Sequence, residues 1–85
     1  MNNVIQRRIA VGAAYAPLSA TPLIFSGDIS CEPTNGAVVY FRGDDGSDVP
    51  WQRGEWHAHK SIDLATVFVK GTVGDYVTAI GGTWA

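Results

Sequence analysis

The chain has 85 residues, enough for one domain, and its six basic and eight acidic residues give a net charge of −2. This balance disfavours a nucleic-acid partner, because affinity for nucleic acid comes from neutralising phosphates with Lys and Arg. The single cysteine, Cys31, excludes an intrachain disulfide and a four-cysteine zinc site, and the lack of any apolar run near the roughly 18 residues of a membrane helix disfavours a membrane partner.

Proline and glycine divide the first third of the chain into short extended segments. Residues 4–12 carry four branched aliphatic side chains and are predicted to form the first strand. Residues 13–22 are rich in alanine and contain two prolines, which favours a loop or an extended crossing segment. Residues 23–25 are predicted to form a short strand that ends at a turn over residues 26–28.

The middle of the chain contains the strongest predicted strand. Ile29 and Cys31 alternate with a serine and are expected to share one face. Residues 32–36 then turn at an Asn-Gly pair, which readily accepts positive φ. Residues 37–42 are β-branched and aromatic and lie between two glycines, a composition typical of a central strand.

A polar stretch follows and is predicted to be an exposed loop over residues 43–50, continued by residues 51–54. Counted from Asp44, it resembles a calcium loop, with Asp48 at position five and Glu55 at position twelve. Glycine stands at position three, where a ligand belongs, and valine at position six, where the sharp turn needs glycine. We therefore expect a flexible acidic loop, with adventitious calcium as the alternative.

Residues 55–59 alternate strictly between two faces of a predicted strand. Trp56 and Ala58 share one face and are expected in the core, whereas Glu55, His57 and His59 share the other. We expect this second face to be solvated. The alternative is a metal-dependent oligomer, in which the two histidines act with Glu55 or meet those of other subunits on a threefold axis.

The last third of the chain predicts a terminal β-hairpin. After a corner at residues 61–64, the β-branched and aromatic runs of residues 64–70 and 76–80 are joined by a short loop that contains glycine. No segment shows sustained helical periodicity. The sequence therefore predicts an all-β fold, a compact antiparallel β-sandwich or jelly roll of about seven to eight short strands, as one domain over residues 1–85.

The sequence contains no motif for catalysis. Ser, His and Asp occur without a Gly-x-Ser-x-Gly elbow, and no glycine pattern matches a phosphate loop. Cys31 has no adjacent basic residue to activate it and is expected in the core. We therefore expect a protein that is not an enzyme and uses no cofactor.

The composition suggests contacts with other subunits. Only 16% of the residues are charged, against about 25% in a typical soluble domain. A small domain with so few charges is expected to expose apolar surface, and large apolar patches usually mark contacts. We expect a homo-oligomer, with a trimer favoured.

Two tryptophans are candidates for these contacts. Trp51 lies in the polar loop, where it could stack on a sugar or anchor a protein interface; the alternative is that it packs under its own loop. Trp84 is expected to close the sandwich or to contact a neighbouring subunit. The full set of candidate binding or interface residues is Trp51, Arg53, Asp44, Asp45, Asp48, His57, His59 and Trp84.

The order of the segments adds a resemblance. In succession the chain has a Pro-Leu-Ser-Ala-Thr-Pro-Leu passage, an Asn-Gly turn into a strand that ends in a tyrosine and a glycine loop, and a Gly-Glu turn. An Ile-Asp-Leu corner, a Val-Phe-Val strand, and Gly-Asp with an alternating strand complete the series. Over residues 17–84 this order resembles that of short β-sandwich accessory proteins of tailed bacteriophages. The resemblance implies a capsid decoration, head spike, fibre module or tail-attached knob, often trimeric, with no catalytic motif.

We therefore expect a non-enzymatic structural protein of a phage virion, assembled in the host cytoplasm, that docks on capsid or tail proteins. Residues 4–11, Trp84 and the polar loop are the expected contacts. The alternative is a carbohydrate- or receptor-binding module that uses the loop of residues 43–53, with a glycan as its partner.

Overall fold

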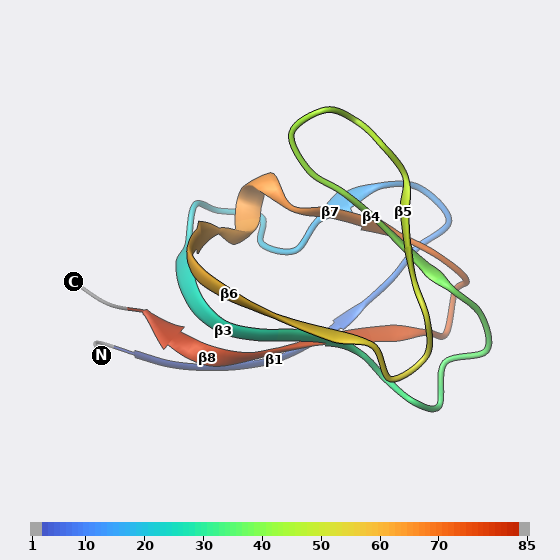
Figure 1. Cartoon of the computed structure of the whole chain (residues 1–85), viewed down its shortest axis with the longest axis horizontal. Coiled ribbons are helices and arrows are strands. Elements are labelled where there is room, and N and C mark those ends of the chain that lie inside the picture. The colour runs from blue at the N-terminus through green and yellow to red at the C-terminus, as the bar shows by residue number, and fades with distance from the viewer. Residues whose placement is uncertain (1–2, 84–85) are drawn as a thin grey trace.

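The computed structural model describes residues 3–83, which form eight strands and one 3₁₀ turn in two facing sheets (Figure 1). The strands are β1 (Asn3–Ala10), β2 (Ala16–Pro17), β3 (Ile24–Cys31), β4 (Val39–Arg42), β5 (Val49–Trp51), β6 (Trp56–Asp63), β7 (Phe68–Lys70) and β8 (Tyr76–Thr83). The 3₁₀ turn, η1 (Leu64–Thr66), lies between β6 and β7.

The strands are connected as a jelly roll. β1 pairs with β8, β2 with β7, β3 with β6 and β4 with β5, all antiparallel, so the chain folds as one long hairpin with the β4–β5 loop at its tip. Pairing of β3 with β8 and of β4 with β7 completes two sheets, with strand orders β1-β8-β3-β6 and β2-β7-β4-β5. Eight antiparallel strands in two such sheets are a jelly roll, and the predicted all-β sandwich is confirmed.

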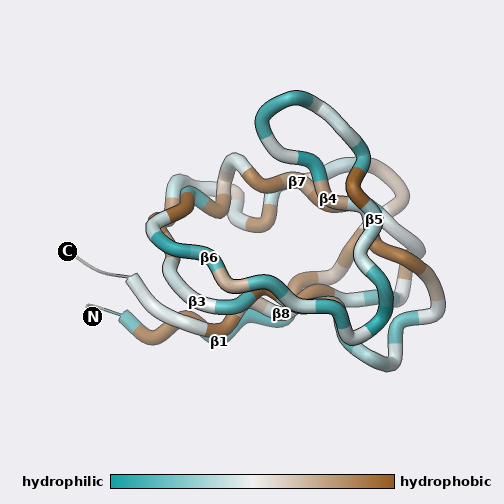
Figure 2. The backbone as a smooth tube through the Cα atoms, viewed as in Figure 1, coloured by the Kyte–Doolittle hydropathy of each residue, from teal (hydrophilic) through white to brown (hydrophobic). Residues whose placement is uncertain are grey.

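The hydrophobic core lies between the two sheets. Its most deeply buried side chains are Phe25, Ile29, Leu64, Val39, Val77 and Cys31. Ile29 and Cys31 share the inward face of β3, as the alternation predicted. Burial, together with the nearby carboxylates of Glu55 and Asp75, raises the pKa of the Cys31 thiol to about 11. The β4–β5 loop lies outside this core and is largely hydrophilic (Figure 2).

β3 continues through residues 26–28, where the sequence predicted a turn. That prediction was wrong, because Gly27 marks a close approach of β3 to β8 and not a chain reversal. Gly27 is paired with Gly81 and has a φ of +152°. A Cβ on Gly27 would lie 2.6 Å from the Cα of Gly81 and would collide with the carbonyl oxygen of Ile80. Glycine on both strands therefore lets them pair at this point.

The predicted terminal hairpin does not form, because β7 and β8 belong to different sheets. The residues between them cross from one sheet to the other and are fixed by the chain after β1. The N–H of Gly71 donates to the carbonyl of Gly12 at 2.9 Å, and the N–H of Val11 donates to the carbonyl of Asp75 at 3.1 Å. The Asp75 carboxylate also accepts from two backbone N–H groups ahead of β4.

Several boundaries differ from the prediction: the first strand ends at Ala10 and not at residue 12, and the central strand begins at Val39 and not at residue 37. Two further differences are larger. Val49–Trp51 form β5 and pair with β4, so the predicted loop contains a short strand. β6 extends through most of the predicted corner to Asp63, whose carboxylate caps η1 by accepting from the N–H of Ala65 at 3.0 Å. Pairing with a neighbouring strand, and not local composition, decides both cases.

Candidate functional site

The core face predicted for β6 is wrong, because Trp56 and Ala58 are both exposed. Trp56 was expected in the core but is 60% exposed. Its register partner Ser30 lies on the outer face of β3, whereas His57 is paired with the buried Ile29. His57 therefore lies on the sandwich side of this edge strand but its side chain is still 53% exposed, in line with the predicted solvated face, and His59 is half-buried. Trp56 points away from the sandwich.

Trp51, and not Trp56 as predicted, packs in the core. It is only 8% exposed, and its ring stacks on that of Phe41 with a centroid separation of 3.7 Å. His57 contacts the same indole edge-on at 4.6 Å, and His59 lies parallel to it at 6.4 Å. A sugar site built on Trp51 therefore lacks an open aromatic face.

Glu55 and the two histidines lie together, as predicted, but they satisfy one another and the backbone. The Nε2 of His57 lies 2.7 Å from the Oε2 of Glu55, and the Nδ1–H of His59 donates to the carbonyl of His57 at 3.0 Å. The hydrogen bond from His57, with one from the backbone of Gln52, lowers the pKa of Glu55. Within residues 3–83, no group of three or more His, Cys, Asp or Glu side chains forms a metal-binding cluster.

The acidic loop does not gather its carboxylates either. Asp44 is exposed at its start, and Asp45 accepts from the N–H of Ser47 at 2.9 Å, which lowers the pKa of Asp45. Asp48 turns back to the β2-β7-β4-β5 sheet, as described below, and Arg53 lies beyond β5 at its other end. The structure thus separates Arg53 from the aspartates by a strand, and Trp84 lies outside the described residues.

The outer face of the β1-β8-β3-β6 sheet carries an exposed apolar surface, which the composition led us to expect but did not locate on this sheet. We call it the Trp56 face. Its register rows place Val4 opposite Gly82, and Ile80 opposite Asp28. Four of its side chains are large, hydrophobic and exposed: Val4 at 70%, Trp56 at 60%, Ile80 at 55% and Ile24 at 49%.

Small side chains lie between these apolar side chains, so the Trp56 face is nearly flat. Ser30 and Thr78 lie between Trp56 and β1 and share a hydrogen bond of 2.6 Å. A shallow pocket of about 360 Å³ is lined by Trp56, Ile80, Asp28 and their neighbours. At the border, Arg8 donates to Glu32 at 2.7 and 3.0 Å, which lowers the pKa of that carboxyl. Charge is therefore paired at the rim, and Asp28 on β3 is the charged side chain near the centre.

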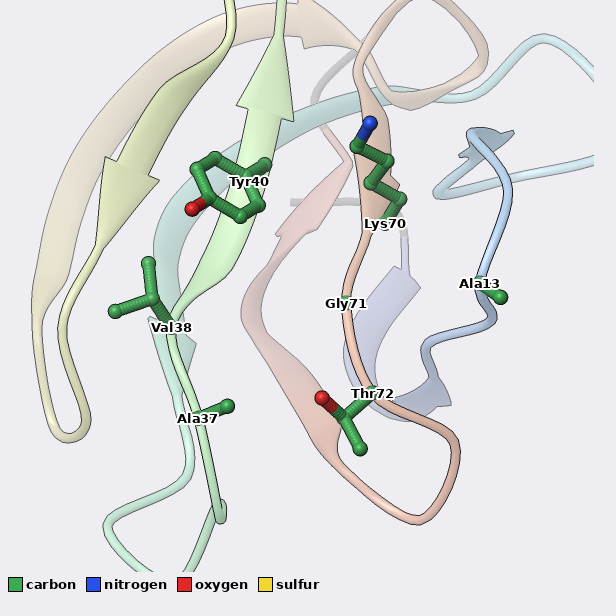
Figure 3. Close-up of a pocket in the computed structure, with 7 residues that line it drawn as sticks. All are labelled: Ala13, Ala37, Val38, Tyr40, Lys70, Gly71 and Thr72. Carbon is green, nitrogen blue, oxygen red and sulfur yellow. The ribbon is translucent and has the colours of Figure 1, made fainter.

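The outer face of the β2-β7-β4-β5 sheet is different, and we call it the Tyr40 face. Here Asp48 accepts from the hydroxyl of Tyr15 at 2.6 Å and from Arg42 at 2.7 Å, and both hydrogen bonds lower its pKa. The Arg42 guanidinium lies 4.0 Å from the centre of the Tyr15 ring, and the Lys70 amine lies 4.9 Å from it. Beside this cluster, Tyr40 and Lys70 border a shallow pocket of about 410 Å³ (Figure 3).

Comparison with family models, with curated proteins and with solved structures gave no match for this chain. Among the residues that the structure describes, no helix has the length and apolar character to cross a membrane.

Proposed function

We propose that this protein is a non-enzymatic structural subunit of a phage virion, a decoration, spike or knob that docks on the capsid or tail, with a trimer as the favoured assembly. The Trp56 face is its docking surface. The observation that carries the proposal is the concentration of exposed Trp56, Ile80, Val4 and Ile24 on one face of one sheet.

The jelly-roll fold supports a role as a structural protein of a virus particle, because viral capsid proteins and lectins recurrently use this architecture. The exposed apolar side chains of the Trp56 face favour docking by shape complementarity and apolar burial over catalysis. Contiguous apolar patches on small soluble domains mark interaction surfaces. Trp56 lies at one corner of this face, on the edge strand β6, and an exposed tryptophan is the residue type that most often dominates binding energy.

The size of the Trp56 face fits this role. Four strands about 4.8 Å apart and about 26 Å long present roughly 500 Å² of flat surface. A standard interface buries about 800 Å² per partner, about one sixth of the 4991 Å² that the chain exposes. The sheet face and its rims together can supply that area without unfolding any element.

Cosedimentation with particles tests the proposal. Particles of the virus whose genome encodes the chain are purified by density gradient and mixed with tagged protein. We expect the protein to pellet with them, and to be found by mass spectrometry in native particles. Trp56→Ala should weaken docking about thirtyfold, the effect of losing a hot-spot side chain.

Val73→Ser is the matched control, because Val73 is a 77% exposed apolar residue that belongs to the β7–β8 loop and to no strand of the Trp56 face. It should dock like the unaltered protein. Native mass should show whether the subunit is a trimer before it docks. Absence of the protein from purified particles would overturn the proposed function, and docking by Trp56→Ala at unaltered strength would overturn the choice of face.

A further inference from the structure

We infer that the Tyr40 face is a binding site for an acidic sugar, a pyranose that carries a carboxylate. The juxtaposition behind this inference is that of two tyrosines and two cations on one outer sheet face, beside an open pocket. Tyr15, Tyr40, Arg42 and Lys70 supply the aromatic rings and the positive charges.

Sheet register fixes the two residues that border the pocket. Tyr40 on β4 is the direct cross-strand partner of Lys70 on β7, so both side chains project from the same face. Figure 3 shows them at one end of the pocket, on neighbouring strands. Tyr40 is 39% exposed, which leaves part of its ring open to a ligand.

The pocket forms because β4 and β7 diverge after this pair. Ala37 and Val38 lie on one side of the opening, and Gly71 and Thr72 on the other (Figure 3). Gly71 borders the opening with its backbone alone, and a Cβ there would point inward, 3.3 Å from the buried Val11 and 3.6 Å from the buried Val39. The resulting volume of about 410 Å³ is in the range of small-ligand sites.

Charge selects the class of ligand. On the Tyr40 face, Arg42 and Lys70 stand against the one carboxylate of Asp48, a surplus of one positive charge in a chain whose net charge is −2. Asp48 is already engaged by Arg42 and Tyr15, so Lys70 is the cation next to the pocket. The Lys70 ammonium lies over the Tyr15 ring, and its cross-strand partner Tyr40 has a partly exposed ring. Together they suit a ligand with a carboxylate and an apolar C–H face, which is the chemistry of an acidic pyranose.

An extended acidic peptide fits this site less well. Peptides that add to a sheet need an unpaired strand edge. β4 and β7 are the two inner strands of their sheet, with partners on both sides. A ligand here must therefore lie on the face and be held by side chains.

The Trp56 face could dock on the particle while the Tyr40 face stays free to bind a ligand, an inference that depends on the proposed function. The Tyr40 and Trp56 faces lie on opposite sides of the sandwich. A subunit docked by Trp56 would present the Tyr40 face outward, toward a host surface. Sugar binding itself needs no particle, so its test is independent of docking.

The test measures binding of the isolated protein to three carboxylated polysaccharides: polygalacturonate, alginate and polysialic acid. Methyl-esterified polygalacturonate is the matched neutral ligand, and poly-glutamate is the acidic peptide. We expect at least one polysaccharide to bind in biolayer interferometry, with no binding of the methyl ester and weaker binding of poly-glutamate.

Substitutions on the Tyr40 face test whether the ligand binds there. Lys70→Gln should weaken binding about fivefold, the upper range for an exposed ion pair, and Tyr40→Ala should weaken it by a similar factor, whereas Tyr40→Phe keeps the ring and should bind. Lys60→Gln is the control, because it removes the same charge from β6 in the other sheet. The inference is overturned if no carboxylated polysaccharide binds, if poly-glutamate binds as tightly, or if Lys60→Gln and Lys70→Gln weaken binding equally.

Discussion

Gly81→Ala should destabilise the fold severely, because two backbones meet where the methyl group would stand. A Cβ on Gly81 would lie 2.7 Å from the Cα of Gly27 and 2.9 Å from the carbonyl carbon of Ser26. The Cβ would also collide with the carbonyl oxygen of Ser26, and ordinary contact begins at 3.4 Å, so β3 and β8 would have to separate by at least about 0.7 Å. Ladder hydrogen bonds of about 2.9 Å would then stretch to about 3.6 Å, beyond the useful range.

The cost of this separation can be set against the stability of the domain. Overpacking that moves backbone costs up to about 3 kcal/mol, and a domain of this length is stable by roughly 4–13 kcal/mol. With a urea dependence of about 1.3 kcal/mol per molar, the midpoint should fall by about 2 M. Urea unfolding followed by circular dichroism measures this shift directly.

Gly43→Ala is the matched control for this substitution. Gly43 has no atom within 4 Å of its Cβ position and no positive φ, so alanine there should be neutral or stabilise by about 0.4–1 kcal/mol through the unfolded state. If Gly81→Ala unfolds at the same urea concentration as Gly43→Ala, β3 and β8 do not approach as closely as described, and the account of the sheet centre is wrong.

Three further outcomes are expected. At about pH 8, a Cys31 thiol with a pKa of about 11 is ionised to roughly one part in a thousand, so it should react with a thiol reagent only after denaturation. Because Arg8 holds the pKa of Glu32 low, that pair stabilises the fold above the unfolded pKa and is lost as the pH falls through the folded one; Arg8→Gln should therefore lower the melting temperature more at about pH 7 than at about pH 3. Trp51→Ala should cost about 3–5 kcal/mol in urea unfolding, whereas Trp56→Ala should stay within about 0.5 kcal/mol.

The fold class was predictable because it depends on local signals that are clear in the sequence. Turn residues recur at short intervals, and β-branched runs separate them, so the sandwich follows. What local signals lack is the identity of each strand's partner. The runs at β7 and β8 look like a hairpin from their composition, yet Gly71 and Asp75 bind the chain after β1 and carry the connection across to the other sheet.

The candidate site was predicted less well, and the alternation of β6 shows why. Period-two alternation identifies two faces but not which of them is inward. Trp56 looked like the core residue because histidines are more often solvated. In the structure Trp51 already occupies that space, and the imidazoles of His57 and His59 border it at the open edge of the sandwich.

The same alternation explains how a chain with so few charges can hold two different outer faces. Each strand gives one set of residues to the shared core and keeps the other for its own outer surface. On β3 and β8 that outer set is small or apolar apart from Asp28, with Ser30, Thr78 and Ile80 on the same face as Trp56, so most of the face gains by being covered. On β4 and β7 it is Tyr40, Arg42 and Lys70, which stay hydrated when exposed. The face that is costly to expose is therefore the one expected to dock, and the polar aromatic face is the one left to meet a ligand.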